Sequence, residues 1–435
     1  MRRKKVGIVL TVAISCLLSL AGCSEKKSSE RVGESTEEGS GAKTYQKTSK
    51  PVLTTDNGCY YYSIEDSGFR YVDTVTGKEM FLCNKPECKH DGDVFCAATN
   101  ERYTIDSYCL YNNKIYVNAV EETNTQYLYK VLTIEMDGSE LNEVCTYLTL
   151  EKTEQNSLFD KGGSGFVVHK DKMLIPLSVG GQANLADAMF YGGAVLNLEN
   201  GEVDYLDEEP LSKENGKVSN LSACGEYFYY WKKEGKTQKV LHRYHLTEKI
   251  DESIDLLTGF TGNYVVLDDN TVIYQVKQGL WLCKYDSNTG ENEKKVKLVR
   301  EEIIAYNGTE PVVNTHFFNP EQMKTDGEYV YVTERLVLST LKSFQRYLHI
   351  YNAAMEEVAV FDYLWELEKV EFEGHEDIKF FYGDLWWSGE DVVCVAYQKE
   401  NMVDKYVFRC KKADLLEGEP EFKFVCMYTT EGSMN

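Results

Sequence analysis

Proline and helical patterns are both scarce in this chain. The 435 residues include only 7 prolines but 31 tyrosines. Aromatic and β-branched residues fit the pleated surface of a sheet, so this composition favours strands over helices. No long segment has its apolar residues at the spacing of an amphipathic helix, and we expect short helices only within two loops, at 182–189 and 362–368.

Basic residues are also in deficit. The chain has 47 lysines and arginines against 70 aspartates and glutamates, which gives a formal net charge of −23. Such a surface repels phosphate groups and keeps an exposed protein soluble. The composition therefore excludes nucleic acid, and anionic lipid surfaces, as general partners.

Recognisable catalytic motifs are missing from the sequence as well. It has no Gly-x-Ser-x-Gly turn, no phosphate-binding glycine loop and no His-Glu-x-x-His pair. The stretch 286–290 starts like a calcium loop but lacks the later glutamate, and we interpret it as a turn. With 70 acidic residues, no carboxylate pair for glycoside chemistry can be chosen, because that chemistry depends on separation in space. Whether the chain is an enzyme stays open, and the missing motifs favour a non-enzymatic role.

The first part of the chain has the features of a targeting segment. The basic run 2–5 precedes an apolar run at 6–20, which is short for a membrane span and long enough for a signal peptide. The run ends in Leu20-Ala21-Gly22-Cys23, which resembles the lipobox of bacterial lipoproteins. That resemblance implies removal of residues 1–22, a diacylglycerol on Cys23 and attachment to the outer side of the cell membrane through lipid alone. The alternative is an ordinary secretory signal peptide with a chance cysteine.

The next segment, 23–49, is rich in Ser, Glu, Lys and Gly and has almost no large apolar residue. It cannot bury enough surface to fold, so we predict a flexible tether. The folded part is then a single domain, 50–435.

That domain repeats one order of strands and turns. The unit is clearest at 324–361, where the turn Asp326-Gly327 is followed by strands at 328–332, 347–351 and 357–361. A first set of turns lies at Asn57-Gly58, Asn112-Asn113, Lys170-Asp171, Cys224-Gly225, Asp269-Asn270, Asp326-Gly327 and 389–391. A second set lies at Thr76-Gly77, Asp137-Gly138, Asn200-Gly201, Glu248-Lys249, 288–290, Asn352-Ala353 and Glu417-Gly418. Glycine, asparagine and aspartate recur there because tight hairpin turns require positive φ.

The two sets stay in phase over about seven units, which predicts an all-β fold. We expect a β-propeller of about seven four-stranded blades, with six or eight as alternatives, since closing a ring of sheets removes their exposed edges. A pair of β-sandwiches is disfavoured because it would not keep both turn sets in register. Over residues 51–428 the pattern is similar to propeller-type lipoproteins of Gram-positive bacteria, many of uncharacterised function.

One cluster has the spacing of a metal site. Cys83, Cys88, His90 and Cys96 fall in the first connection between units. They could bind a structural zinc ion as a Cys₃His site, but an extracytoplasmic location favours disulfide pairing, which we place ahead of zinc, with free thiols third. Beyond a possible structural zinc, no cofactor is required.

The other cysteines carry less information. The chain has 13 cysteines, and eleven remain when Cys16 of the signal segment and Cys23 are set aside. Because eleven is odd, not all of them can pair within the chain. Those inside strand patterns are interpreted as small buried apolar residues. They are Cys59, Cys283, Cys394 and Cys410.

The long connections are expected on one face of the ring, around the channel mouth. They lie at 84–103, 146–163, 178–188, 300–319, 335–343 and 363–378. Loops on a rigid scaffold often carry function, and aromatic or histidine side chains near the mouth could stack on a sugar or supply acid–base groups. The candidates are His316, Phe317, Trp365, Trp386 and Trp387. For any one of them, packing between blades is the commoner role.

These observations predict a monomeric, membrane-anchored module that binds a glycan, a peptide or another envelope protein. The alternative is a carbohydrate-active hydrolase or lyase, because some propeller families have such activities. A minor third possibility is a metal-carrying or redox role through residues 83–96.

Overall fold

The computed structural model describes most of the chain after residue 45. The described residues are 46–47, 53–55, 58–63, 67–73, 76, 78–92, 96–152, 165–179, 189–207, 211–212, 217–235, 238–277, 281–297, 299–307, 310–317, 320–338, 343–372, 378–388, 390–398 and 404–429. The predicted signal peptide and Cys23 lie outside them. The chain divides into two units, Met1–Ser40 and Gly41–Asn435, and the described residues belong to the second.

Seven antiparallel sheets follow one another along the chain, each a meander of four consecutive strands. Blade 1 consists of β2 (Leu53–Thr54), β3 (Gly58–Ser63), β4 (Gly68–Asp73) and β5 (Glu79–Phe81). Blade 2 consists of β6 (Tyr103–Tyr111), β7 (Lys114–Glu122), β8 (Gln126–Glu135) and β9 (Leu141–Glu151). Blades 3 and 4 are β10 (Val167–His169), β11 (Lys172–Val179), β12 (Met189–Asn197), β13 (Val203–Tyr205), and β15 (Val218–Cys224), β16 (Tyr227–Glu234), β17 (Gln238–His245), β18 (Asp251–Ile254). Blade 5 is β19 (Phe260–Asp268), β20 (Thr271–Val276), β21 (Trp281–Asp286), β22 (Glu291–Lys297). Blades 6 and 7 are β25 (Pro320–Thr325), β26 (Val330–Leu338), β27 (Ser343–Tyr351), β28 (Glu357–Asp362), and β29 (Phe380–Ser388), β30 (Asp391–Gln398), β31 (Asp404–Lys411), β32 (Lys423–Thr429).

The predicted hairpin turns have the backbone that their residues favour. Both residues of Asn112-Asn113 have positive φ, 47° and 57°, and both residues of Lys170-Asp171 do as well, 47° and 54°. Two consecutive positive φ values match the twist of the flanking strands, so these turns set the pairing register. The prediction that such residues mark the repeat is confirmed at these positions.

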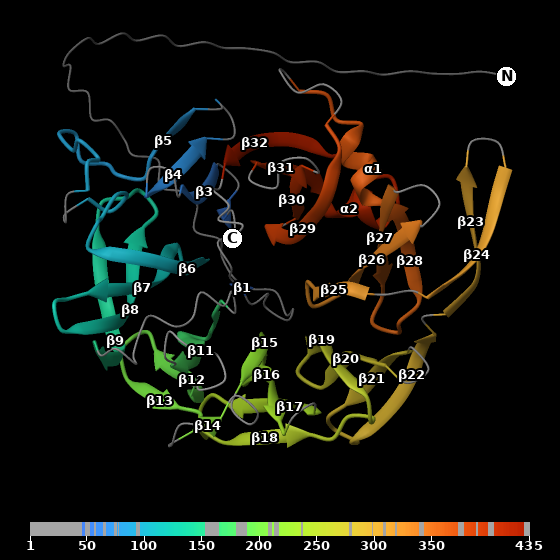
Figure 1. Ribbon diagram of the computed structural model, residues 1–435, viewed down its shortest axis with the longest axis horizontal. Helices are drawn as coiled ribbons and strands as arrows, with labels where there is room; N and C mark the ends of the chain where they lie inside the picture. Colours follow the sequence, from blue (N-terminus) through green and yellow to red (C-terminus); the bar gives the residue numbers. More distant parts are fainter. Residues whose placement is uncertain are drawn as a thin grey trace, which may run out of the picture. The chain divides into compact units, whose positions relative to one another are not determined.

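Seven hydrophobic clusters fill the spaces between successive blades, and the seventh closes the ring. Alternate residues of a strand face opposite sides, so in β3 Tyr60 packs toward blade 2, whereas Cys59 and Tyr61 pack with Val393 and Val407 of blade 7. A contact between the first and last blades requires a closed circle, which Figure 1 shows. The structure is therefore a seven-bladed β-propeller, as predicted, and six or eight blades are excluded.

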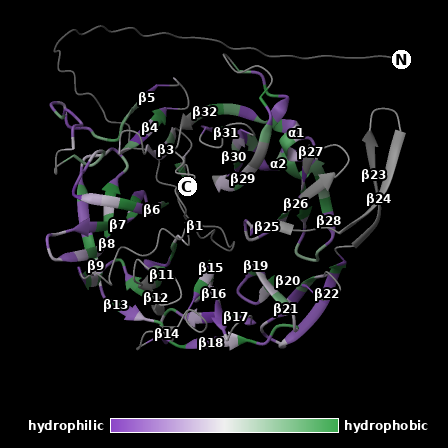
Figure 2. Cartoon of the chain, in the orientation of Figure 1, coloured by the Kyte–Doolittle hydropathy of each residue, from purple (hydrophilic) through white to green (hydrophobic). Residues whose placement is uncertain are grey.

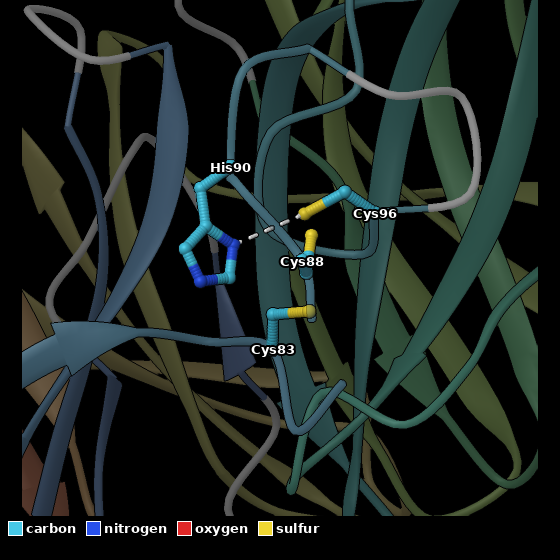
Figure 3. A group of neighbouring side chains, drawn as sticks. All are labelled: Cys83, Cys88, His90 and Cys96. Atoms are coloured by element: carbon cyan, nitrogen blue, oxygen red, sulfur yellow. Dashed lines mark hydrogen bonds between the residues drawn. The ribbon is translucent and has the colours of Figure 1, made fainter. Parts of the chain in front are cut away.

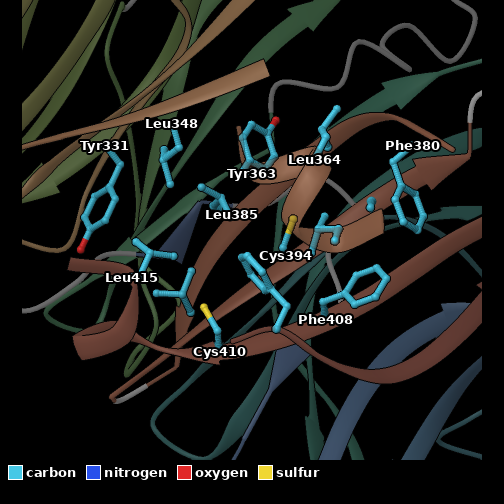
Figure 4. Packing of buried hydrophobic residues seen from close by; sticks show 14 of the residues in the cluster. Tyr331, Leu348, Tyr363, Leu364, Phe380, Leu385, Cys394, Phe408, Cys410 and Leu415 are labelled. Atoms are coloured by element: carbon cyan, nitrogen blue, oxygen red, sulfur yellow. The ribbon is translucent and has the colours of Figure 1, made fainter. Parts of the chain in front are cut away.

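Burial decreases from the middle of each blade to its outermost strand. Between blades 6 and 7 the core includes Leu348, Cys394 and Phe408, each with no exposed surface (Figure 4). The outermost strand of blade 5, β22, consists mainly of charged residues and is hydrophilic in Figure 2. The core thus lies between the sheets.

Three connections differ from the predicted loops. The segment expected as a loop at 300–319 contains a separate two-stranded sheet, β23 (Val299–Asn307) with β24 (Glu310–Phe317), which extends outward beside blade 6 in Figure 1. The two strands are joined by two residues, one of them glycine, which is a hairpin pattern that the loop interpretation overlooked. In addition, β9 continues to Glu151 and β26 to Leu338, so those connections are shorter than expected.

The predicted helix at 362–368 is present as α1 (Tyr363–Glu368). Asp362 is its N-cap, and the Asp362 side chain accepts a hydrogen bond from the backbone N–H of Trp365. A second helix, α2 (Lys412–Leu416), was not predicted. The other predicted helix, at 182–189, lies outside the described residues except for its last residue, which belongs to β12. No helix among the described residues is long and apolar enough to cross a bilayer.

Blade 3 is widened by two short strands. β14 (Leu211–Ser212) pairs with β12, and β1 (Gln46–Lys47) pairs antiparallel with Val167 and Val168 of β10. β1 comes from the segment predicted as a tether, and Figure 1 places it near the centre of the ring.

Candidate metal site

The connection after β5 is held against blade 1 at both of its ends. The backbone N–H of Leu82 donates to the carbonyl oxygen of Phe69 at 2.9 Å, and the N–H of Phe69 donates to the carbonyl of Ala98 at 3.0 Å. The chain between Leu82 and Ala98 therefore leaves the edge of blade 1 and returns to it. In Figure 1 this connection lies on the outer side of the ring, away from the channel.

Four potential metal ligands meet inside this connection. The Sγ atoms of Cys83, Cys88 and Cys96 and a ring nitrogen of His90 all lie within 4.8 Å of one another. Figure 3 shows the four side chains pointing toward a common centre, with His90 Nδ1 at 3.6 Å from Cys96 Sγ. Cys96 is buried, and the other three are half-buried. The cluster could bind a metal ion.

Local turns shape the cluster. The backbone N–H of Cys88 donates to the carbonyl of Lys85 at 3.2 Å, which reverses the chain between the first two thiols. His90 has a φ of 56° and Gly92 a φ of 93°, so the backbone takes left-handed conformations next to the histidine. These reversals bring residues from Cys83 to Cys96 together, although none of the described residues between them belongs to a helix or strand.

The hydrogen bonds of the cluster favour a thiolate at Cys96. Burial opposes ionisation, but contacts with His90 and with the hydroxyl and N–H of Thr99 outweigh it and lower the pKa of the Cys96 thiol from 9.0 to about 6. Burial raises the pKa of Cys83 to about 11. Thiolate is the form of cysteine that binds metal, so Cys96 offers a ligand already suited to a cation near neutral pH.

Neighbouring residues fix the orientation of the cluster. The centre of the His90 ring lies 4.6 Å from the centre of the Phe81 ring. The Arg70 guanidinium lies 3.5 Å from the centre of the same Phe81 ring. Asn84 donates to the Asp137 carboxylate in the turn of blade 2 at 3.1 Å. The connection therefore bridges blades 1 and 2.

The geometry favours metal over the disulfide pairing that the sequence analysis placed first. A disulfide would use two of the three thiols and leave the third thiol and the imidazole without a role. The structure instead brings three sulfurs and one nitrogen to one point. Four protein ligands would fill a tetrahedral site and leave no position for substrate, so the role would be structural.

The aromatic candidates do not share one environment. Trp365 is 55% exposed on α1, where Lys369 and Lys379 approach its ring. Trp387 packs at 4.7 Å from Tyr331 between blades 6 and 7. Trp386 faces the opposite side and packs between blades 7 and 1. Their roles in ligand binding remain predictions.

The remaining two candidates, His316 and Phe317, belong to β24. Their backbone pairs with Arg300 and Val299, and their side chains lie outside what the structure describes.

Several residues around the four potential metal ligands were not predicted from the sequence. Thr99 could have been anticipated, because it lies three residues after Cys96 and hydroxyl or amide donors at that spacing often reach a thiolate. Phe81 and Arg70 could not, since their contact depends on the β4–β5 register that places them opposite each other.

No protein-family model matches this chain, and no curated protein sequence does. Solved structures resemble it in fold. A puromycin hydrolase mutant complexed with PGG has a TM-score of 0.50 and 11% identity, covering 89% of this chain and 55% of its own. A prolyl endopeptidase structure has a TM-score of 0.49 and 8% identity, covering 91% of this chain and 51% of its own. TolB from Acinetobacter baumannii has a TM-score of 0.36 and 10% identity, covering 89% of this chain and 81% of its own. The chain spans about half the length of the first two, and at these identities the likeness concerns the propeller fold alone.

Proposed function

We propose that this protein is a lipid-anchored, extracytoplasmic propeller that binds a glycan, a peptide or another envelope protein. The lipobox Leu20-Ala21-Gly22-Cys23 supports the anchor. The closed ring of seven blades, built from a sequence without catalytic motifs, supports binding rather than catalysis. A ring of this kind holds its loops at fixed positions, which reduces the ordering cost of binding a ligand.

The anchor is tested by metabolic labelling of a bacterium expressing the full chain with an alkyne fatty acid. The wild-type protein should carry the label and sediment with membranes, whereas Cys23→Ala should lose both properties. Cys16→Ala, which changes a cysteine inside the apolar run, is the matched control and should keep them. An unlabelled wild-type protein in the soluble fraction would refute the proposed anchor.

Binding is tested with the soluble chain beginning at Ser24, which retains the whole compact unit from Gly41 onward. Immobilised polysaccharides, peptidoglycan fragments and envelope peptides are the probes, and saturable retention of one class is the expected result. The same mixtures are analysed for shortened or unsaturated sugars. Turnover of a polysaccharide would contradict the binding role and support the hydrolase or lyase alternative.

The metal ion best suited to the cluster is zinc. Three thiolates and one imidazole are a common ligand set of structural Zn²⁺, which takes tetrahedral geometry with Zn–S distances of about 2.3 Å. Hard cations such as Mg²⁺ and Ca²⁺ prefer oxygen ligands, and the four donor residues here offer none through their side chains. Zinc would tie the connection between blades 1 and 2 at its centre.

Metal content decides this assignment. Purified protein should contain about one zinc per chain by elemental analysis, as expected for one four-ligand site. Replacement by Co²⁺ should give the strong visible absorption and sulfur charge-transfer bands of a tetrahedral thiolate site. Cys88→Ser should lose the metal, and Cys145→Ser, which changes a half-buried cysteine in blade 2, should retain it. Protein that contains no metal and shows a disulfide among Cys83, Cys88 and Cys96 would refute the zinc assignment.

A further inference from the structure

The junction between blades 7 and 1 is where the ring closes on itself. Among the described residues, blade 1 consists of β2–β5 alone and blade 7 of β29–β32 alone. No described strand from one end of the chain completes the sheet at the other end. The two blades are therefore joined through side chains, in a cluster that includes Tyr61, Val72 and Val395.

Two cysteines meet at this junction. Cys59 on β3 is 1% exposed, and Cys426 on β32 is 8% exposed. Both belong to the cluster between blades 7 and 1, and the Cys59 thiol is within hydrogen-bonding reach of the Cys426 thiol. The two residues are separated by nearly the whole folded unit in sequence, so only closure of the ring brings them together.

We propose that Cys59 and Cys426 form a disulfide that covalently closes the propeller in the mature protein. The bond would join the first and last blades, where no described strand passes from one sheet to the other. The proposal rests on the extracytoplasmic location proposed above, because disulfides persist in oxidising compartments.

The chemistry is thiol–disulfide exchange with an external disulfide, such as oxidised glutathione. One thiolate of the pair attacks the external disulfide, whose S–S bond breaks and releases one glutathione thiolate. The second thiolate then attacks the mixed disulfide, which forms the Cys59–Cys426 bond and releases a second glutathione. The two cysteines are oxidised, the external disulfide is reduced, and the two protons are left on the two glutathione thiols.

The burial of the pair sets the order of events. The hydrogen bond with Cys59, together with burial, raises the pKa of the Cys426 thiol well above its ordinary value. The neutral thiol is a poor nucleophile, so oxidation should be slow in the packed protein and faster while the ring is still closing.

Two other buried cysteines, Cys224 and Cys283, have polar neighbours of other kinds. Cys224 donates to the Asp269 carboxylate at 3.4 Å, and Cys283 lies beside the Tyr274 hydroxyl. Cys283 is fully buried and lies between blades 4 and 5, so it provides a matched control for a cysteine substitution between blades.

The test refolds the chain beginning at Ser24 from denaturant with excess zinc, in buffer with either oxidised or reduced glutathione. The excess zinc is added to fill the proposed site at residues 83–96 and so keep those thiols from the exchange. Non-reducing peptide mapping by mass spectrometry should recover a linked peptide pair containing Cys59 and Cys426 from the oxidised sample. The oxidised protein should melt about 3–6 °C higher than the reduced one, as expected for a disulfide that closes a long loop in a chain of this size.

The variants separate the bond from general packing. Cys59→Ser and Cys426→Ser should abolish both the linked pair and the difference in melting temperature, while Cys283→Ser should retain both. If a serine variant fails to fold, Cys59→Ala and Cys426→Ala replace it, and peptide mapping of the wild-type protein needs no variant. Recovery of both residues as free thiols after oxidative refolding, or linked to other cysteines, would overturn the proposal. The assay contains no membrane, so its result is independent of whether Cys23 is acylated.

Discussion

The substitution Asp362→Asn should stabilise this protein at neutral pH. Asp362 caps α1, and its carboxylate accepts the N–H of Trp365 at 3.1 Å. Burial of the carboxyl group is the main cause that raises its pKa from 3.8 to about 6, and the nearby Glu368 adds to the effect, while the N–H groups of the first helical turn partly oppose it. The folded protein therefore holds an aspartate that ionises less readily than it does in the unfolded chain.

The sign and size of the effect follow from this difference. Because the folded-state pKa is the higher one, protonation stabilises the folded form as the pH falls from about 6 to 4, and that stabilisation is lost as the pH rises through the same window. The rise of the pKa from 3.8 to about 6 corresponds to a difference of roughly 3 kcal/mol in the free energy of unfolding. The side chain is only half-buried, so screening by solvent reduces the expected value to between about 1 and 2 kcal/mol.

Asparagine has no charge to bury and caps a helix about as well as aspartate. The Asn variant should therefore be more stable than the wild-type protein at pH 7 by about 1–2 kcal/mol, and the two should converge near pH 4. Urea denaturation followed by tryptophan fluorescence, at pH values from 4 to 8, measures the difference. Asp414→Asn, in the first turn of α2, is the control for removing one negative charge from this acidic protein.

A variant that is less stable than the wild-type protein at pH 7, or a difference that does not shrink toward pH 4, would refute the reasoning. An equal gain from Asp414→Asn would show that the net charge of −23, and not the burial of Asp362, is the cause.

Three further predictions concern the core, the metal-site connection and an ion pair. Phe408→Ala, which removes a ring with no exposed surface between blades 6 and 7, should cost about 3–5 kcal/mol in urea denaturation, and a cost below about 1 kcal/mol would contradict its central position. Gly138→Ala should lower zinc content, because a Cβ there would lie 2.3 Å from the carbonyl oxygen of Leu82, next to Cys83. Gly290 has a similar φ, but a Cβ there would meet no atom within 4 Å, so Gly290→Ala should leave the zinc content unchanged. In Asp391 burial opposes ionisation, but Lys411 and Arg409 outweigh it and lower the pKa of the carboxyl group, so its contribution to stability is present above pH 3.8 and lost as the pH falls below that value. Asp391→Asn should lower stability at pH 7 and flatten acid unfolding below pH 4, and an unchanged acid transition would contradict this assignment.

Features set by neighbouring residues could be predicted from the sequence. The seven-bladed ring followed from turn residues that favour positive φ and from strands of alternating residues, both of which act within a few residues of one another. The helix at Tyr363–Glu368 was likewise local, with Asp362 available as a cap. The grouping of Cys83, Cys88, His90 and Cys96 was predicted because a short connection limits how far its residues can separate.

The choice between metal and disulfide needed the structure. Spacing along the chain allows either, since both bring thiols close together. The His90 ring lies 4.6 Å from the Phe81 ring, and its Nδ1 lies 3.6 Å from Cys96 Sγ, so the imidazole could serve as a fourth ligand. The β23–β24 hairpin was also missed, because the sequence analysis assigned all residues between units to loops.

The sequence by itself determined that this chain would form a ring of sheets with a cluster of potential metal ligands in its first connection, because turn preference, strand alternation and short-range chain reversal are local properties. Only the tertiary structure decided which distant residues meet. Cys59 and Cys426 come together because the rotations between successive blades add up to a full circle. Trp386 and Trp387 point to opposite sides of blade 7, so Trp386 packs against blade 1 and Trp387 packs against blade 6. Such contacts depend on the packing of every blade in the ring, and no local pattern records that sum.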